Sequence, residues 1–401
     1  MSFSFNFSGD DISDSEIEET TTNLAKTNLS SSTQSQSTRL LSLITPQRHT
    51  LPALLNSLPS QLTYNHLAIS SNQSTSTRQS DSNTRSTNGS PLLTIPRRSL
   101  FDIRQQLMAE SDPSDTTDST NTLLAGLESG DLSTGIYEGG FKTWECAVDL
   151  ASYVPGLDFL DALDQGVDVR VVELGAGSAI PSLVLLREVL RRRGMNARLG
   201  NGGVYGEKKR EGKGRVRFTF CDYNEDVLRL CTAANVFLTT ILSSQEDGVV
   251  TTNEDEDIDV DEDHIATCLT ALEAAGISID FISGAWGDQF VDILKQDTYQ
   301  GFSATDPTKP CKTVVLASET IYSPDSLGVF TDTVRSLLDM KNEDRGTDVR
   351  VLVAAKKVYF GVGGGVAEFE GMVRQSGGRT DTVLDVKDAG VVRVVLEVRM
   401  A

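Results

Sequence analysis

The feature that most constrains the fold is a short apolar segment followed by two closely spaced glycines and a leucine-rich stretch. Residues 169–174 carry the valines and leucine of a strand that is buried on both faces. Gly175 and Gly177 remove Cβ atoms where a tight turn would let backbone approach a ligand. Residues 182–193 have the apolar periodicity of an amphipathic helix. This order predicts the ligand-binding end of a doubly wound α/β sheet.

The glycine turn favours S-adenosylmethionine over a dinucleotide. A dinucleotide fingerprint needs a third glycine, and Ile180 stands at that position. Glu173, two residues before Gly175, suits the first motif of S-adenosylmethionine enzymes, whose cofactor has no pyrophosphate to seat on the helix. An ordinary turn in another α/β protein is the alternative. We therefore assign cofactor binding in this segment to Glu173, Gly175, Ala176 and Gly177.

Composition divides the chain. Its 401 residues exceed one typical domain, and a hydrophobic content of 38% is low for a wholly globular chain. We predict a largely disordered Ser/Thr/Asn-rich region over 1–134 and one folded domain over 135–401. Two polar segments, about 194–214 and 244–268, are predicted to be disordered insertions, because acidic blocks such as 254–263 repel themselves into solvent.

Charge and cysteine usage exclude several classes. A net charge of -21 argues against direct nucleic-acid binding; it permits a basic protein substrate, or serves solubility alone. Five cysteines without a C-x-x-C pair indicate reduced thiols in an intracellular protein. The three histidines form no cluster with them, so we predict no metal site. No run approaches the roughly 18 apolar residues of a membrane span, and the N-terminus lacks a secretory signal.

Seven segments of the folded region have the apolar pattern of strands that alternate with helices, and the last two form a hairpin. Five strands closed by such a pair predict an α/β fold with a Rossmann-like seven-stranded sheet, order 3-2-1-4-5-7-6, last strand antiparallel, and helices on both faces. Right-handed crossovers place the first strand centrally, with ligand at its carboxyl end. The segments are 169–174, 216–222, 277–282, 313–317, 349–355, 380–386 and 391–398.

Polar and aromatic residues end the second and third strands. Asp222 is placed to accept both ribose hydroxyls of the cofactor, and the alternative is a helix N-cap. Trp286 supplies a flat surface for adenine, and the alternative is core packing. The cofactor-binding assignments here are Asp222, Tyr223, Asn224, Gly284, Ala285 and Trp286.

The fourth and fifth strands end in residues suited to a substrate. Glu319, beside the sulfonium of a bound cofactor, would accept a hydrogen bond from a substrate nitrogen, and Tyr322 would wall the pocket; a structural pair with a lysine is the alternative for Glu319. The glycines of 360–365 suit a loop that closes over substrate, or a surface loop with no role. We assign Glu319 and Tyr322 as catalytic, Ser318 as cofactor-binding, and Phe360, Gly361, Gly363 and Gly364 as substrate-binding.

Taken together, five segments resemble the eukaryotic histidine protein methyltransferases, a branch of the seven-β-strand S-adenosylmethionine-dependent family. The Tyr-Phe-Gly-Val-Gly-Gly-Gly loop is the more specific signal, and the acid-x-x-aromatic motif is shared with protein-lysine methyltransferases. The resemblance covers about 135–400 and adds Lys142, Thr143, Trp144 and Glu145 to the cofactor-binding residues. The segments are 139–146, 173–179, 222–224, 318–322 and 359–365.

The resemblance implies methyl transfer to an imidazole nitrogen of a histidine in a ribosomal large-subunit protein, by a monomer in cytoplasm and nucleus. Imidazole, with a pKa of about 6.5, is largely neutral in the cell, so alignment replaces a strong base. Glu319 would hold the opposite N–H and fix the tautomer. A protein-lysine methyltransferase and a cofactor-binding scaffold with a recruiting arm remain as alternatives.

Overall fold

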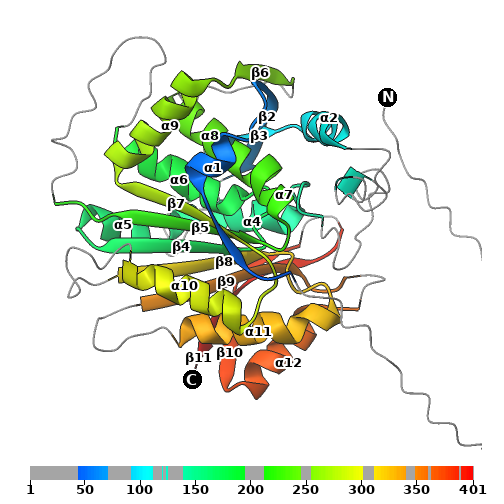
Figure 1. The fold of residues 1–401 in the computed structure, drawn as a ribbon. Coiled ribbons are helices and arrows are strands. Elements are labelled where there is room, and N and C mark those ends of the chain that lie inside the picture. The colour runs from blue at the N-terminus through cyan, green and yellow to red at the C-terminus, as the bar shows by residue number, and fades with distance from the viewer. Residues whose placement is uncertain are drawn as a thin grey trace, which may run out of the picture. The chain divides into compact units, whose positions relative to one another are not determined.

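An eight-stranded sheet forms the centre of the protein. The computed structural model describes residues 44–70, 92–111, 120, 123–124, 139–194, 212–244, 254–300, 311–339, 348–359, 363–387 and 390–400. The strand order is β1-β7-β5-β4-β8-β9-β11-β10 (Figure 1). The strands are β1 (Gln47–Thr50), β4 (Asp168–Leu174), β5 (Val216–Asp222), β7 (Ile277–Ser283), β8 (Cys311–Ser318), β9 (Asp348–Lys356), β10 (Gly378–Val386) and β11 (Arg393–Met400).

Seven of these strands have the predicted order, 3-2-1-4-5-7-6. Strands β7, β5, β4, β8 and β9 are parallel, and β11 pairs antiparallel with both β9 and β10, so the prediction of an antiparallel last strand is confirmed. The eighth strand, β1, was not predicted. It pairs antiparallel with β7 at the edge of the sheet.

Helices cover both faces because the parallel strands are apolar on both sides. Val171 of β4 faces one core cluster and Val172 faces the other. The first cluster is covered by α1 (Leu51–Leu55), α4 (Glu145–Tyr153), α5 (Phe159–Asp164), α6 (Ile180–Arg192), α8 (Ala233–Ile241) and α9 (Glu262–Ala275). The second is covered by α10 (Asp288–Gln300), α11 (Pro324–Leu338) and α12 (Val366–Gln375), on the opposite side of the sheet in Figure 1.

Part of the region predicted to be disordered is folded, so the prediction for 1–134 is wrong at 44–70 and 92–111. There β2 (Gln61–Ser70) and β3 (Leu92–Arg98) pair in a second sheet, and α2 (Leu100–Glu110) follows. Leu62 and Ile95 are fully buried, and the Arg98 N–H donates to Asn235 Oδ1 of α8 at 2.7 Å. Tertiary contacts with α8 therefore order a polar segment that is unremarkable on its own. Apart from 120 and 123–124, the rest of 1–134 lies outside the described residues.

The acidic block is also folded where it is described, which corrects the predicted insertion at 244–268. Its strand β6 (Glu256–Asp259) pairs antiparallel with β2 and completes the second sheet, β3-β2-β6. Repulsion between the carboxylates is offset by donors on β2, such as Thr63 Oγ1, 2.6 Å from Asp257 Oδ1. Asp261 accepts a backbone N–H at the start of α9. Residues 195–211 and 245–253 lie outside the described residues.

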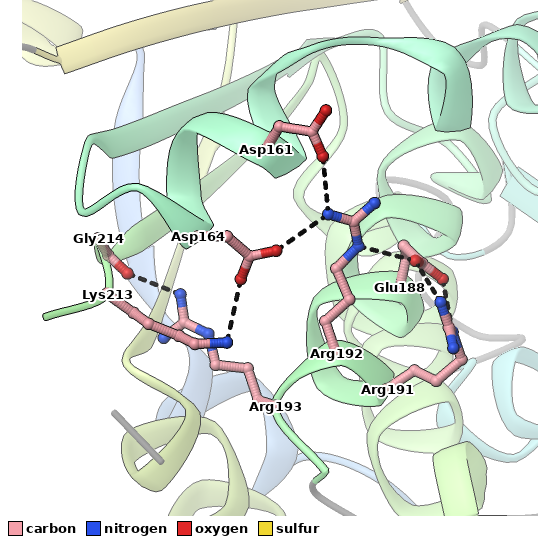
Figure 2. Close-up of polar contacts among 8 residues, drawn as sticks. All are labelled: Asp161, Asp164, Glu188, Arg191, Arg192, Arg193, Lys213 and Gly214. Carbon is pink, nitrogen blue, oxygen red and sulfur yellow. Dashed lines mark hydrogen bonds and ion pairs between the residues drawn. The ribbon is translucent and has the colours of Figure 1, made fainter. Parts of the chain in front are cut away.

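Charged residues surround the amino ends of β4 and β5 (Figure 2). Arg192, at the end of α6, contacts three carboxylates: Nη1 lies 3.1 Å from Asp161 Oδ1 and 3.1 Å from Asp164 Oδ2, and Nε lies 2.9 Å from Glu188 Oε1. Lys213 Nζ reaches the other oxygen of Asp164 at 3.0 Å. These ion pairs join α5, α6 and the segment before β5.

The remaining class predictions concern thiols, membranes and metals. All five cysteines are free, and four of them are buried. Within the ranges given above, no helix combines the length and apolarity that a bilayer span requires. Among those same residues, no three His, Cys, Asp or Glu side chains gather as metal ligands.

Candidate functional site

The candidate residues gather where the parallel strands end. Strand pairing sets Leu174 beside Cys221 on one side and Ala317 on the other, Asp222 beside Ser283, and Ser318 beside Ala354. These five strands are parallel, so the segments that follow β4, β5, β7, β8 and β9 all leave the sheet at the carboxyl ends of its strands, called the carboxyl edge below. This is the edge at which ligands bind in doubly wound folds.

The glycine turn after β4 contacts two of the other motifs. Gly175 has φ +67° and Gly177 has φ +51°, values that disfavour side chains. A Cβ on Gly175 would lie 2.8 Å from Thr320 Cγ2, and one on Gly177 would lie 2.9 Å from Gly140 O. The turn is thus packed between the segment before α4 and the segment after β8, and it has no room for larger residues.

Asp222 holds this turn from the end of β5. Its side chain is buried, with Oδ2 accepting from the Gly177 N–H at 3.0 Å and Oδ1 accepting from the Asn224 N–H at 3.2 Å. The helix that follows, α7 (Glu225–Val227), has Asn224 rather than Asp222 as its N-cap residue. A carboxylate oxygen can accept more than one hydrogen bond, so a carboxylate at this position is chemically suited to ribose hydroxyls.

Five buried polar atoms near the carboxyl ends of the strands have no hydrogen-bond partner among the described residues: Glu173 Oε1, Ser182 Oγ, Asn224 Nδ2, Glu319 Oε1 and Thr320 Oγ1. Glu173 is 1% exposed, and its other oxygen accepts the Ser182 N–H in the first turn of α6 at 3.1 Å. Burial raises the pKa of Glu173 to about 8. Unpartnered buried polar groups are costly, and they are typical of a site that a polar ligand completes.

The segment before α4 is fixed to the glycine turn. Thr143 Oγ1 donates to Ser178 Oγ at 3.0 Å, and Trp144 Nε1 donates to Gly139 O at 3.0 Å. Lys142, directly before Thr143, is half-buried, and its N–H donates to Gly139 O at 3.3 Å. Lys142, Thr143 and Trp144, assigned from the resemblance alone, therefore lie at the same edge as the strand ends.

Trp286, predicted to stack on adenine, packs one side against the core. Its ring centroid lies 5.1 Å from that of Phe330 in α11, and the side chain is half-buried. The neighbouring Ala285 N–H donates to Ile44 O at 2.9 Å, and a Cβ on Gly284 would lie 2.7 Å from Pro46 Cα. The segment before β1, which the sequence reasoning missed, thus lies directly against these residues.

Glu319 follows β8 in a strained conformation. Its φ is +56°, and among the non-glycine residues of the described chain only Ala179, at the start of α6, also has a positive φ. The Glu319 N–H donates to Ala354 O at 2.9 Å, and the side chain is 9% exposed. Glu319 Oε1 lies 3.5 Å from Lys356 Nζ, so the structural pairing with a lysine is present.

Lys356, at the end of β9, is a site residue that the sequence reasoning missed. Its Nζ lies 3.0 Å from Glu145 Oε2 and 5.3 Å from the Trp144 ring centroid. Burial lowers the pKa of Lys356, but the carboxylates of Glu319 and Glu145 outweigh it and raise the pKa overall. Glu145, assigned to the cofactor, here binds Lys356. The available signal was a lysine at a strand end, directly before the glycine loop.

The glycine loop meets the segment after β8. The Gly364 N–H donates to Tyr322 O at 3.0 Å, and a Cβ on Gly364 would clash with that carbonyl. Gly363 has φ +87°, and the rings of Tyr322 and Tyr359 lie edge to face at 6.3 Å between centroids. Two of the predicted substrate-binding residues, Phe360 and Gly361, lie outside the described residues.

Known proteins similar to this chain were found by sequence. "Histidine protein methyltransferase 1" of Saccharomyces cerevisiae is 35% identical over 294 residues, covering 70% of this chain and 69% of the relative. The Schizosaccharomyces pombe protein of the same name is 32% identical, with the same two coverages, 70% and 69%. "Histidine protein methyltransferase 1 homolog" of Bos taurus is 28% identical over 67% of this chain and 57% of its own length. No protein-family model matches the sequence.

Solved structures align only distantly. The structure of "LepI complex with SAM" aligns with 75% of this chain and 55% of that chain at 11% identity. Its TM-score of 0.29 is too low for the likeness to support a conclusion.

Proposed function

Because the chain belongs to the histidine protein methyltransferase family, we propose that it transfers a methyl group from S-adenosylmethionine to an imidazole nitrogen of a histidine in a protein substrate. The observation that carries this proposal is the 35% identity with the Saccharomyces cerevisiae relative, over 70% of this chain. The site at the carboxyl ends of the strands is compatible with that reaction.

The residues present fit the proposed cofactor. Gly175 and Gly177 allow the tight turn that packs against Thr320 and Gly140, and Glu173 Oε1, Thr320 Oγ1 and Asn224 Nδ2 beside it are buried polar atoms without hydrogen-bond partners among the described residues. An amine, a carboxylate and ribose hydroxyls are the kinds of group that such atoms bind. The other residues proposed to hold it are Lys142, Thr143, Trp144, Glu145, Tyr223, Gly284, Ala285, Trp286 and Ser318, with Asp222 on the ribose. When bound, the cofactor supplies a methyl group on a positively charged sulfur.

The chain's own contribution is to orient the histidine. An imidazole nitrogen has a lone pair at neutral pH, because its pKa is about 6.5. Glu319 accepts the N–H of the opposite ring nitrogen, which fixes the tautomer and stabilises the positive charge that develops on the ring. The ring nitrogen would take the methyl group from the cofactor, and the carbon–sulfur bonding pair would stay on sulfur. Glu319, which holds the opposite N–H, would accept that proton from the methylated ring and release it to solvent. Tyr322, Gly363 and Gly364 wall the substrate side.

The finer identity of the substrate is part of the proposal. A histidine of a ribosomal large-subunit protein is proposed, reached by a monomer in cytoplasm and nucleus without direct nucleic-acid contact. The net charge of -21 supports a basic partner of this kind, since opposite charge speeds encounter.

The test is to incubate the purified chain with S-adenosylmethionine and large-subunit ribosomal proteins, then to locate the methylated residue by mass spectrometry. Methylhistidine is expected. Methyllysine would establish the lysine alternative and overturn the proposal. Cofactor binding without any methyl transfer would favour a scaffold. Comparison of ribosomal proteins from cells with and without the chain identifies the substrate.

A further inference from the structure

Strand β1 makes β7 an interior strand of the main sheet. The order β1-β7-β5-β4 places β1 next to the three strands whose carboxyl ends are proposed to hold the cofactor. Because β1 runs antiparallel to β7, with Gln47 opposite Ser283, the residues that precede β1 lie at the carboxyl edge. His49 Nε2 lies 2.8 Å from Ser283 Oγ and ties the two strands together there. Residues 44–46, called the pre-β1 segment below, belong to the blue part of the chain that leads into α1 in Figure 1.

Two contacts fix the pre-β1 segment to the loop that follows β7. Ile44 O accepts the Ala285 N–H at 2.9 Å. Gly284 has φ +109°, and a Cβ on it would lie 2.7 Å from Pro46 Cα, so glycine is required for the two backbones to approach this closely. The pre-β1 segment is thus held against two of the residues that are proposed to bind adenine.

The side chain of Ile44 remains accessible although its carbonyl is bonded to the loop. Ile44 is 42% exposed, and Val329 of α11, whose Cγ1 lies 4.0 Å from the position of a Cβ on Gly287, is 44% exposed. Trp286 stands between Ala285 and Gly287 and is half-buried. Two exposed aliphatic side chains on either side of a tryptophan in the chain loop form an apolar surface, which is the kind of surface that a flat heterocyclic base binds.

We propose that the pre-β1 segment is part of the cofactor site, and that Ile44 contacts the adenine ring and sets the affinity for it. This rests on the proposed function. With the ribose at Asp222, which ends β5, the base extends to the loop after β7, and the next strand in that direction is β1. The pre-β1 segment lies outside 135–400, the part of the chain that carries the family motifs, so the resemblance does not imply this contact.

The first test measures binding without turnover, by calorimetric titration of the purified full chain with S-adenosylhomocysteine. Ile44→Ala should bind it about fivefold more weakly, because apolar area is lost, and Ile44→Leu should bind within a factor of about two of wild type. The thermal unfolding midpoint of the unliganded Ile44→Ala protein should match wild type. Unchanged affinity in Ile44→Ala would overturn the proposal.

Leu100 supplies the matched control for the loss of an exposed aliphatic side chain. It lies at the start of α2, outside the proposed site, and is 40% exposed, close to the 42% of Ile44. Leu100→Ala should bind S-adenosylhomocysteine as wild type does. An equal loss of affinity in Leu100→Ala and Ile44→Ala would show that the effect is not local, and would also overturn the proposal.

The second test identifies which part of the cofactor Ile44 contacts. The ligand 5′-methylthioadenosine keeps the adenosine and lacks the amino-acid part. Ile44→Ala should lose affinity for it by the same factor as for S-adenosylhomocysteine. A loss confined to S-adenosylhomocysteine would place the pre-β1 segment at the amino-acid end of the ligand and would contradict the assignment to adenine.

A backbone variant tests the pre-β1 segment as a whole. Gly284→Ala brings a Cβ against Pro46 and should weaken S-adenosylhomocysteine binding by about tenfold or more. Gly390→Ala, between β10 and β11, is the control for strain alone, since its φ is +128° and nothing lies within 4 Å. Gly390→Ala should bind as wild type does. A folded Gly284→Ala protein with wild-type affinity would refute the proposal.

The third test separates affinity from rate. An adenine contact is the same before and during methyl transfer, so Ile44→Ala should raise KM for S-adenosylmethionine by about fivefold and leave kcat unchanged. A fall in kcat at constant KM would contradict the proposal. If wild type binds both ligands and methylates no histidine, the proposed function fails and the binding tests still decide the role of Ile44. If wild type binds neither ligand, both proposals are overturned.

Discussion

At the amino ends of β4 and β5, charged side chains meet partners near the surface; at the carboxyl ends, they are buried and incompletely partnered. A single residue there, Arg192, contacts the three carboxylates of Asp161, Asp164 and Glu188 (Figure 2). At the other end Glu173 is 1% exposed and one of its oxygens has no hydrogen-bond partner among the described residues. The difference teaches that one end of the sheet is built for stability and the other is held ready for a ligand.

Backbone strain follows the same division. Ala179 and Glu319 are the non-glycine residues with positive φ in the described chain, and both follow the carboxyl ends of strands. Such conformations cost about 1–3 kcal/mol each and persist where the surroundings enforce them. The backbone of Glu319 is held by the hydrogen bond from its N–H to Ala354 O, and its side chain is held by the ion pair with Lys356. The strain lies where the proposed chemistry needs a fixed carboxylate.

The largest expected effect comes from Glu319→Gln. We expect methyl transfer to fall by about 100-fold or more, because the developing ring charge loses its carboxylate. Cofactor affinity should stay within a factor of about three. Single-turnover methylation with saturating substrate measures the effect, and Asp164→Asn at the amino end is the control. Equal losses in the two variants would break the distinction between the two ends.

Next are two glycines with positive φ. Gly177→Ala should cost about 2 kcal/mol or more, because φ is +51° and the new Cβ would lie 2.9 Å from Gly140 O. Gly212→Ala, before β5, should cost about 1 kcal/mol, since φ is +82° but nothing lies within 4 Å. Urea denaturation gives both values. Only Gly177→Ala is expected to impair cofactor binding; similar costs would contradict the packing of the turn.

A pH dependence distinguishes Glu173 from Glu188. Burial raises the pKa of Glu173 to about 8. Because this exceeds the unfolded value of about 4.3, its contribution to stability is full below that pH and is lost as pH rises through the folded pKa. The free energy of unfolding of wild type should therefore fall by about 2 kcal/mol or more relative to Glu173→Gln between pH 5 and 8. Denaturation at four pH values measures this.

Glu188 supplies the matched control with the opposite sign. Burial opposes ionisation there, but hydrogen bonds from Arg191 and Arg192 outweigh it and lower the pKa of Glu188. Its contribution is present above the unfolded pKa and is lost only as pH falls through the folded value. Between pH 5 and 8, Glu188→Gln should run parallel to wild type. A parallel course for Glu173→Gln as well would refute the ionisation argument.

The smallest effect is expected from Arg192→Ala. Its guanidinium is part of a partly exposed network, so the loss should be about 1 kcal/mol or less and smaller still in 1 M salt. Methyl transfer should be unchanged. Thermal unfolding with and without salt, together with an activity assay, measures both. A loss of activity would show that the amino end takes part in function.

The sequence predicted the central fold because its signals are local. Apolar runs such as 169–174 and 216–222 mark strands buried on both faces, and crossover handedness then orders them. The same rule predicted that Asp222 and Glu319 follow the two strands on either side of β4. Segments 44–70 and 92–111 could not be predicted in this way, because their order depends on distant partners such as Asn235. Strand β6 likewise depends on donors from β2.

The site was predicted in outline and missed in its electrostatics. Glu319 and the glycine turn could be predicted from their positions after strands. Lys356 could not, because it is recognised as a site residue only through its ion pair with Glu145, which lies 211 residues earlier in the chain. Trp286 shows a similar limit. An aromatic residue after a strand predicts a stacking surface, but the sequence does not reveal that Phe330 covers one side.

Calorimetric titration with S-adenosylmethionine tests most directly the claim that the carboxyl end alone holds the ligand. Wild type, Asp222→Ala and Asp164→Ala are compared, the last being an aspartate of the amino-end network. We expect Asp222→Ala to weaken binding by about tenfold or more, or about 1.4 kcal/mol, and Asp164→Ala to bind as wild type does. Equal affinity in all three proteins would contradict the account.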